Sequence, residues 1–124
     1  MDDLAPLADE SYCYLTTTGR VSGEPREIEI WFGLAGETLY MLSGGRDRSD
    51  WVKNLLREPA VTVRIAERTF DGRARVVEDP DEDARARELL FEKYSPGYSG
   101  DLADWRARSL PVAVELGISG QRLG

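Results

Sequence analysis

Strand-like segments follow one another in this chain through connections too short for a crossover, which leaves few folds open to it. Alternating apolar and polar residues predict strands over 12–17, 26–33, 38–42, 61–65, 69–77 and 110–116. Parallel neighbours need a connection of about a dozen or more residues, whereas several of these segments are joined only by turns. We therefore expect an antiparallel sheet with a hairpin between the second and third segments. Closure of that sheet into a compact barrel would remove its exposed edges.

Three segments carry the end signals of helices. Ser49 can cap a helix that ends before Pro59, and Asp79 can cap a second helix with Pro80 at its first position. A shorter helical piece is expected over 101–108. The fold class predicted from these patterns is mainly β (α+β), a six-stranded antiparallel barrel with two or three short helices in its connections.

The length and the residue types narrow the possible chemistry. A chain of 124 residues is long enough for one domain and too short for two, so we expect a single domain over 1–124. The sequence contains no histidine, which excludes Ser-His-Asp and Cys-His triads and most catalytic zinc sites, and we expect no metal site. Cys13, the single cysteine, is expected to lie in the core of a strand. An enzyme of this composition would depend on a bound cofactor.

Charge and hydropathy bear on partners and location. The formal net charge of -7 argues against nucleic-acid binding. No apolar stretch approaches the roughly 18 residues of a membrane span, so stable membrane insertion is not expected. The first residues lack the basic and then apolar pattern of a signal peptide, which makes the cytoplasm the expected location.

Two glycine-containing segments could bind an anion. The segment 16–26 places Arg20, Ser22 and Arg26 around a glycine turn, where guanidinium groups and backbone N–H groups can meet an anion. The segment 43–55 joins paired glycines to basic residues and a helix start. The alternatives are a solvated hairpin turn and a strand-to-helix turn with internal ion pairs. The amide of Asn54, on an apolar helix face, must find backbone or ligand partners.

A third segment, 94–100, contains Tyr94 and Tyr98 on either side of a Pro-Gly loop, with Trp105 beyond it. Tyrosine rings and hydroxyl groups can line a pocket, or they can simply seal the last helix against the barrel.

The order of these segments resembles the deazaflavin-dependent nitroreductase family. Thr-Thr-Thr-Gly-Arg-x-Ser-Gly-x-Pro-Arg at 16–26 resembles the opening motif of that family. The Gly-Gly pair at 44–45, followed by Trp51, Asn54-Leu55, Pro59 and the Val-x-Val strand at 61–63, resembles the second motif of the family. The segment from Tyr94 to Arg108, followed by Leu-Pro-Val, resembles its tyrosine-rich C-terminal region.

The resemblance implies a split β-barrel related to the pyridoxamine-phosphate-oxidase-like, FMN-binding fold, and it implies coenzyme F420, a deazaflavin with a phosphate and an oligoglutamate tail. The cofactor-binding positions carried over are Thr18, Arg20, Ser22 and Arg26 in the first motif and Ser43, Gly44, Gly45, Arg46, Trp51 and Asn54 in the second. Tyr94 and Tyr98 would face the substrate and act as the catalytic residues. A homodimer is also implied.

The expected activity is hydride transfer from the reduced deazaflavin to an electron-poor small molecule such as a quinone or a nitroaromatic compound. Two alternatives stay open at this point. One is a reductase of the same barrel that uses FMN, and the other is a non-catalytic protein that binds the deazaflavin or another flat ligand.

Overall fold

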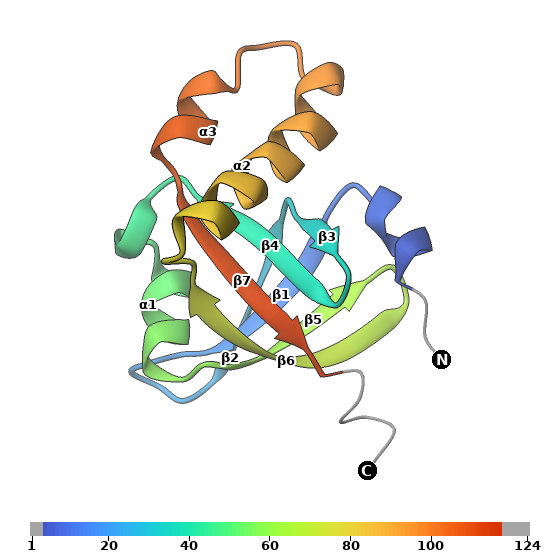
Figure 1. The fold of residues 1–124 in the computed structure, drawn as a ribbon. Coiled ribbons are helices and arrows are strands. Elements are labelled where there is room, and N and C mark those ends of the chain that lie inside the picture. Colours follow the sequence, from blue (N-terminus) through green and yellow to red (C-terminus); the bar gives the residue numbers. More distant parts are fainter. Residues whose placement is uncertain (1–3, 118–124) are drawn as a thin grey trace.

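Within residues 4–117, which the computed structural model describes, seven strands form one curled antiparallel sheet (Figure 1). The sheet has the order β2-β1-β5-β6-β7-β4-β3. Its strands are β1 (Cys13–Thr18), β2 (Pro25–Ile30), β3 (Gly33–Ala35), β4 (Thr38–Ser43), β5 (Ala60–Ile65), β6 (Arg68–Val76) and β7 (Leu110–Leu116). The mainly β fold class is confirmed, with seven strands in place of six. The ends of the expected domain, 1–3 and 118–124, lie outside the described residues.

The expected single strand over 26–33 is wrong, and its division explains how the barrel closes. The chain leaves β2 at Ile30 and enters β3 at Gly33, so only Trp31 and Phe32 separate the two strands. β2 pairs with β1 at one edge of the sheet, whereas β3 forms the hairpin with β4 at the other edge. Because two residues link opposite edges, the sheet must curl until these edges approach one another.

The interior of the curled sheet is filled by side chains from most of its strands. Leu15, Phe32, Met41 and Val63 are fully buried there. Cys13 is also fully buried, as expected for a core residue, and burial raises the pKa of its thiol to about 12. The thiol is therefore protonated at neutral pH and poorly suited to act as a nucleophile.

Helices occupy the connections and one outer face. Their bounds are η1 (Ala5–Asp9), η2 (Arg46–Arg48), α1 (Asp50–Arg57), α2 (Pro80–Tyr94), η3 (Ser95–Gly97) and α3 (Ala103–Arg108), where η marks a short 3₁₀ helix. α2 lies across β4 and β7 and contacts α3 beside it (Figure 1). None of the helices within 4–117 is both long enough and apolar enough to span a membrane.

The predicted caps of the two main helices differ in outcome. Asp79 caps α2 as expected, because its Oδ2 accepts a hydrogen bond of 2.9 Å from the backbone N–H of Glu82. Ser49 stands at the cap position of α1, but its side chain makes no capping bond. The Ser49 hydroxyl instead lies 2.8 Å from the hydroxyl of Ser43, so the predicted side-chain cap is wrong.

A polar network joins α2 to the outer face of the sheet. Glu82 accepts hydrogen bonds from the Tyr40 hydroxyl at 2.6 Å and from both terminal nitrogens of Arg75 at 2.9 and 2.7 Å. The Arg75 guanidinium and the Tyr40 hydroxyl lower the pKa of Glu82 to about 2. Because the folded protein holds this carboxylate ionised, its contribution is complete above about pH 4.5 and is lost as the pH falls toward 2.

We therefore expect Glu82→Gln to lower the free energy of unfolding at pH 7 by about 1–2 kcal/mol, with a smaller loss near pH 3. Urea denaturation at both pH values measures the difference. Asp104→Asn is the matched control, because Asp104 and its partner Arg108 are 78% and 80% exposed and such pairs contribute little. Equal losses for Glu82→Gln at the two pH values would contradict the expectation.

Candidate functional site

The turn between β1 and β2 is a closed loop that presents its arginines on a defined backbone. The Gly19 N–H donates to the Glu24 carbonyl at 2.7 Å, and the Gly23 N–H donates to the Gly19 carbonyl at 2.8 Å. Gly23 has a φ of 76°, a conformation that side chains disfavour. A Cβ added to Gly19 would lie 2.9 Å from Ser22 Oγ, so the loop closes tightly only with glycine at that position.

Asn54 joins this turn to α1. The side chain is 3% exposed, and its Oδ1 accepts from the Arg20 backbone N–H at 3.1 Å and from Arg20 Nη1 at 2.9 Å. Its Nδ2 donates to the Thr17 hydroxyl at 3.1 Å. The partners required by the buried amide are therefore residues of the turn region, and Asn54 sets the position of Arg20.

A cavity of about 690 Å³ lies between the turn and α1. It brings together five of the predicted cofactor-binding residues: Arg20, Ser22, Arg26, Trp51 and Asn54. The remaining lining residues are Thr17, Gly19, Val21, Pro25, Glu27, Ile28 and Asp50. Arg26 Nη2 donates to Ser22 Oγ at 3.3 Å, and Arg20 Nη2 lies 3.2 Å from Asp50 Oδ1. Two guanidinium groups thus face one shared space.

The other residues of the second motif do not line this cavity. The buried Ser43 hydroxyl donates to the Arg46 carbonyl at 2.8 Å, and a Cβ on Gly45 would meet Ser49 Oγ at 2.5 Å. Arg46 Nη1 donates to the Arg108 carbonyl. Gly44 is exposed. For Ser43, Gly44, Gly45 and Arg46, cofactor binding stays a prediction.

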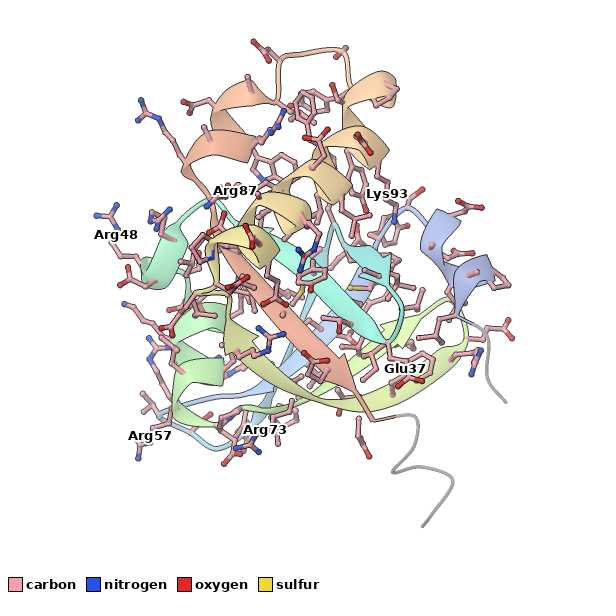
Figure 2. All side chains as sticks on the ribbon, in the orientation of Figure 1. Glu37, Arg48, Arg57, Arg73, Arg87 and Lys93 are labelled. Atoms are coloured by element: carbon pink, nitrogen blue, oxygen red, sulfur yellow. The ribbon has the colours of Figure 1, made fainter. Side chains whose placement is uncertain are left out.

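Thr18 and Arg48 do not line the cavity of about 690 Å³. Thr18 lines a smaller cavity of about 320 Å³ beside the same turn, together with Arg57 and Glu58. Arg48, the other arginine beside the paired glycines, is exposed and extends from η2 away from the sheet (Figure 2).

An aromatic cluster surrounds Trp31 where the chain passes between β2 and β3. The Tyr94 ring stacks on Trp31 with centroids 4.2 Å apart and planes 4° apart. Tyr98 and Trp105 meet Trp31 edge-on, with centroids at 5.9 and 5.4 Å. The two predicted catalytic tyrosines are therefore brought together, and Trp31 and Trp105 join them.

The two tyrosine hydroxyl groups differ in how far they are engaged. Tyr94 Oη accepts from the Phe32 N–H at 3.0 Å, and it lies 2.8 Å from the Ser11 carbonyl and 3.0 Å from the Phe32 carbonyl. Burial raises the pKa of Tyr94 to about 12. Tyr98 is 47% exposed, and its hydroxyl makes no hydrogen bond with residues 4–117. Tyr98 is thus the freer of the two to contact a substrate.

Lys93 strengthens the attachment of α2 at Phe32. Its Nζ donates to the Phe32 carbonyl at 2.9 Å and lies 3.7 Å from the centroid of the Phe32 ring. Burial lowers the pKa of Lys93 to about 8. The side chain lies on the side of α2 nearest η1 (Figure 2). Lys93 and Tyr94 therefore bind the backbone of the two-residue link between the sheet edges.

A second cavity, of about 280 Å³, opens beside this cluster, and β2 runs along both cavities. The second cavity is lined by Tyr12, Glu29, Ile30, Trp31, Leu42 and Trp105. Arg26 lines the first cavity and Trp31 the second, five residues further along the chain. That spacing corresponds to about 16 Å of extended chain. A basic site and an aromatic site therefore lie along β2 and the residue that follows it.

The family model described as F420H(2)-dependent quinone reductase matches residues 5–117. The chain belongs to this family. As a member of the F420H2-dependent quinone reductases it is an oxidoreductase whose cofactor is F420, which favours the deazaflavin over the FMN alternative. The resemblance to the deazaflavin-dependent nitroreductases is confirmed to that extent.

Solved structures share the fold of this F420H2-dependent quinone reductase family member. A structure named F420 reductase is 21% identical, with 94% of each chain covered and a TM-score of 0.66. An F420-H2 dependent reductase (FDR-A) is 24% identical, with 84% of this chain and 92% of that chain covered and a TM-score of 0.65. A candidate pyridoxamine 5'-phosphate oxidase of Listeria innocua is 19% identical, with 91% and 89% covered and a TM-score of 0.67. The split-barrel fold is therefore confirmed.

The residues around the larger cavity fit the anionic part of F420. Its phosphate requires positive charge and hydrogen-bond donors, and the cavity offers the Arg26 and Arg20 guanidinium groups and the Ser22 hydroxyl.

Over the described range, 4–117, no group of three or more acidic or cysteine side chains could hold a metal ion.

Three residues of the cavities and the aromatic cluster, namely Trp31, Lys93 and Asp50, were not predicted from the sequence as site residues. Trp31, which lines the second cavity, was not among the predicted site residues. Lys93 carried no motif signal, because its partner is a backbone carbonyl 61 residues away. Asp50 was not among the predicted site residues, and its contact with Arg20 depends on how the turn folds over α1.

Proposed function

We propose that this protein reduces quinone-like and nitroaromatic acceptors with F420H2, that the cavity beneath the β1–β2 turn holds the phosphate of the cofactor, and that the cluster around Trp31 faces the acceptor. One observation carries the proposal. Side chains from the two family motifs, Arg20 from the turn, Arg26 from β2 and Trp51 from α1, line the same cavity.

The roles of the residues follow from their surroundings. When bound, reduced F420 supplies the hydride. Arg26 and Ser22 bind the phosphate by charge and hydrogen bonding, and Asn54 holds Arg20 in position beside them. Trp31 and Trp105 offer ring faces to a flat acceptor. The free hydroxyl of Tyr98 donates a hydrogen bond to the acceptor oxygen, while the proton that completes reduction comes from Tyr98 or from water.

The direct test mixes reduced F420, menadione and the purified protein, and follows the return of the oxidised F420 absorbance. We expect oxidation of F420H2 to be faster with the protein than without it. A parallel titration with F420 and with FMN should give tighter binding of F420. Binding of F420 without turnover of any quinone or nitroarene would instead support the non-catalytic alternative.

Tyr98→Phe should lower kcat with menadione by about three- to tenfold, the effect of one lost hydrogen bond, and leave the Kd for F420 unchanged. Steady-state kinetics and fluorescence titration measure the two quantities. Tyr94→Phe serves for comparison, because it removes the hydroxyl bound to Phe32 and Ser11 and should mainly lower stability. A kcat for Tyr98→Phe equal to that of the wild type would remove Tyr98 from the reaction.

A homodimer remains part of this proposal. β2 is an edge strand of the sheet, and a second copy of the chain could pair with that edge. Sedimentation velocity should then give a species of twice the chain mass of 13.9 kDa. A species of single chain mass at micromolar concentration would contradict the dimer.

A further inference from the structure

Two cations and two anions face the cavity beneath the β1–β2 turn. Asp50 Oδ1 accepts a hydrogen bond of 3.2 Å from Arg20 Nη2, and the Asp50 side chain is 86% exposed. The other anion, Glu27, lies 3.8 Å from Arg64 Nη2. Arg26 makes no ion pair with any residue of the described chain. The cavity therefore contains one guanidinium without a carboxylate partner and one that shares its charge with Asp50.

Arg20 cannot move away from Asp50 without breaking other bonds. Arg20 Nη1 donates to Asn54 Oδ1 at 2.9 Å and lies 3.5 Å from the Asp50 carbonyl, and the Arg20 backbone N–H donates to the same Asn54 oxygen. Asn54 is buried and fixed on α1. An anion that binds Arg20 must therefore lie close to the carboxylate of Asp50.

The two candidate cofactors differ in the charge of the phosphate that would lie there. The phosphate of F420 is a diester and carries one negative charge, whereas FMN ends in a monoester that carries about 1.5 to 2 at pH 7. Coulomb energy is proportional to each charge, so a nearby carboxylate opposes the monoester about twice as strongly. Arg26 supplies one positive charge that no carboxylate of the described chain balances, and this single charge equals that of the diester in magnitude.

We propose that Asp50 is a specificity-determining residue that favours the singly charged phosphodiester of F420 over the doubly charged phosphomonoester of FMN. The inference rests on the proposed placement of the cofactor phosphate in this cavity. Asp50 acts by repulsion: it weakens the binding of both anions, and it weakens the binding of the dianion more. Removal of its charge should therefore tighten both cofactors and reduce the difference between them.

The test compares Asp50→Asn with the wild type using three ligands of increasing phosphate charge: riboflavin, F420 with the shortest available tail, and FMN. Asparagine keeps an oxygen that can accept from Arg20, so mainly the charge changes. We expect the Kd to fall about threefold for F420 and about tenfold for FMN, with no change for riboflavin. The two factors should shrink as salt is added, because Asp50 is exposed.

Asp47→Asn is the matched control. Asp47 is an exposed acid three residues before Asp50, and it lines none of the cavities described above. Asp47→Asn removes the same charge from the protein without changing a contact of Arg20. The Kd values in this variant should therefore stay within twofold of the wild type. Similar effects in both variants would show only the general charge of the protein and would overturn the role of Asp50.

Other outcomes are equally decisive. Equal tightening of F420 and FMN in Asp50→Asn, or no change in either, would overturn the inference, as would FMN binding that is undetectable in both proteins. FMN binding that appears only in Asp50→Asn would support it. Failure of the proposed function looks different, because the wild-type protein would then either not bind F420 or bind it without turnover of any quinone or nitroarene, whatever the effect of Asp50→Asn on the Kd values.

Discussion

Arg26→Ala should raise the Kd for F420 by about ten- to hundredfold, which is the effect of losing one charge-assisted contact of about 1.5–3 kcal/mol. Arg26 is the cavity guanidinium that no carboxylate of the described chain neutralises, so its full charge is available to an anion. Fluorescence titration of F420 measures the change. Arg20→Ala should raise the Kd over the same range, but it also removes partners of Asn54 and Asp50.

The matched control for Arg26→Ala is Arg73→Ala. Arg73 is an exposed arginine of β6 that lines none of the cavities described above, and it lies at the bottom of the view in Figure 2. Loss of this charge should change the Kd by less than about twofold, since it lies outside the cavity. A Kd for Arg26→Ala within twofold of the wild type would place the cofactor phosphate elsewhere.

Asn54→Leu is expected to weaken both the fold and cofactor binding. Leucine has a similar volume but leaves the Thr17 hydroxyl and the Arg20 backbone N–H without their partner, in a part of the molecule where Asn54 and Thr17 are 3% and 2% exposed. Unpaired buried polar groups of this kind lower the free energy of unfolding by about 2–3 kcal/mol. The Kd for F420 should also rise about tenfold, because Arg20 loses its fixed position.

Urea denaturation and F420 titration separate the two effects of Asn54. Thr17→Val is the matched variant, because it removes only the bond between Thr17 and the amide nitrogen. We expect it to lower the free energy of unfolding by about 1 kcal/mol and to raise the Kd for F420 much less than Asn54→Leu does, because Arg20 keeps both of its hydrogen bonds to Asn54. If Asn54→Leu has the same stability and the same Kd as the wild type, Asn54 does not hold the turn.

The two-residue link between β2 and β3 holds the aromatic cluster around Trp31 in place. Lys93 and Tyr94, at the C-terminal end of α2, both bind the backbone of Phe32, and Trp31 stacks on Tyr94. The link between β2 and β3 lacks sheet partners of its own, so α2 supplies them. Closure of the sheet and placement of the Trp31 ring, which we propose to face the acceptor, are therefore achieved by the same contacts.

Local patterns in the sequence predicted much of the fold. Short connections predicted antiparallel pairing, alternation predicted strands such as β7, and Asp79-Pro80 predicted the start of α2, because each of these depends on neighbouring residues alone. The order of three short motifs indicated the family and the cofactor. The grouping of Arg20, Ser22 and Arg26 was also predictable, since they lie within or just after one turn.

Tertiary structure alone decided which distant groups meet. The strand expected over 26–33 alternates without a break in the sequence, yet it is divided because the curling sheet needs its two halves at opposite edges. Asn54 and Asp50 reach Arg20 across 34 and 30 residues, and Tyr94 reaches Phe32 across 62. Such contacts depend on how the whole sheet curls. The spacing of residues along the chain does not predict that curvature.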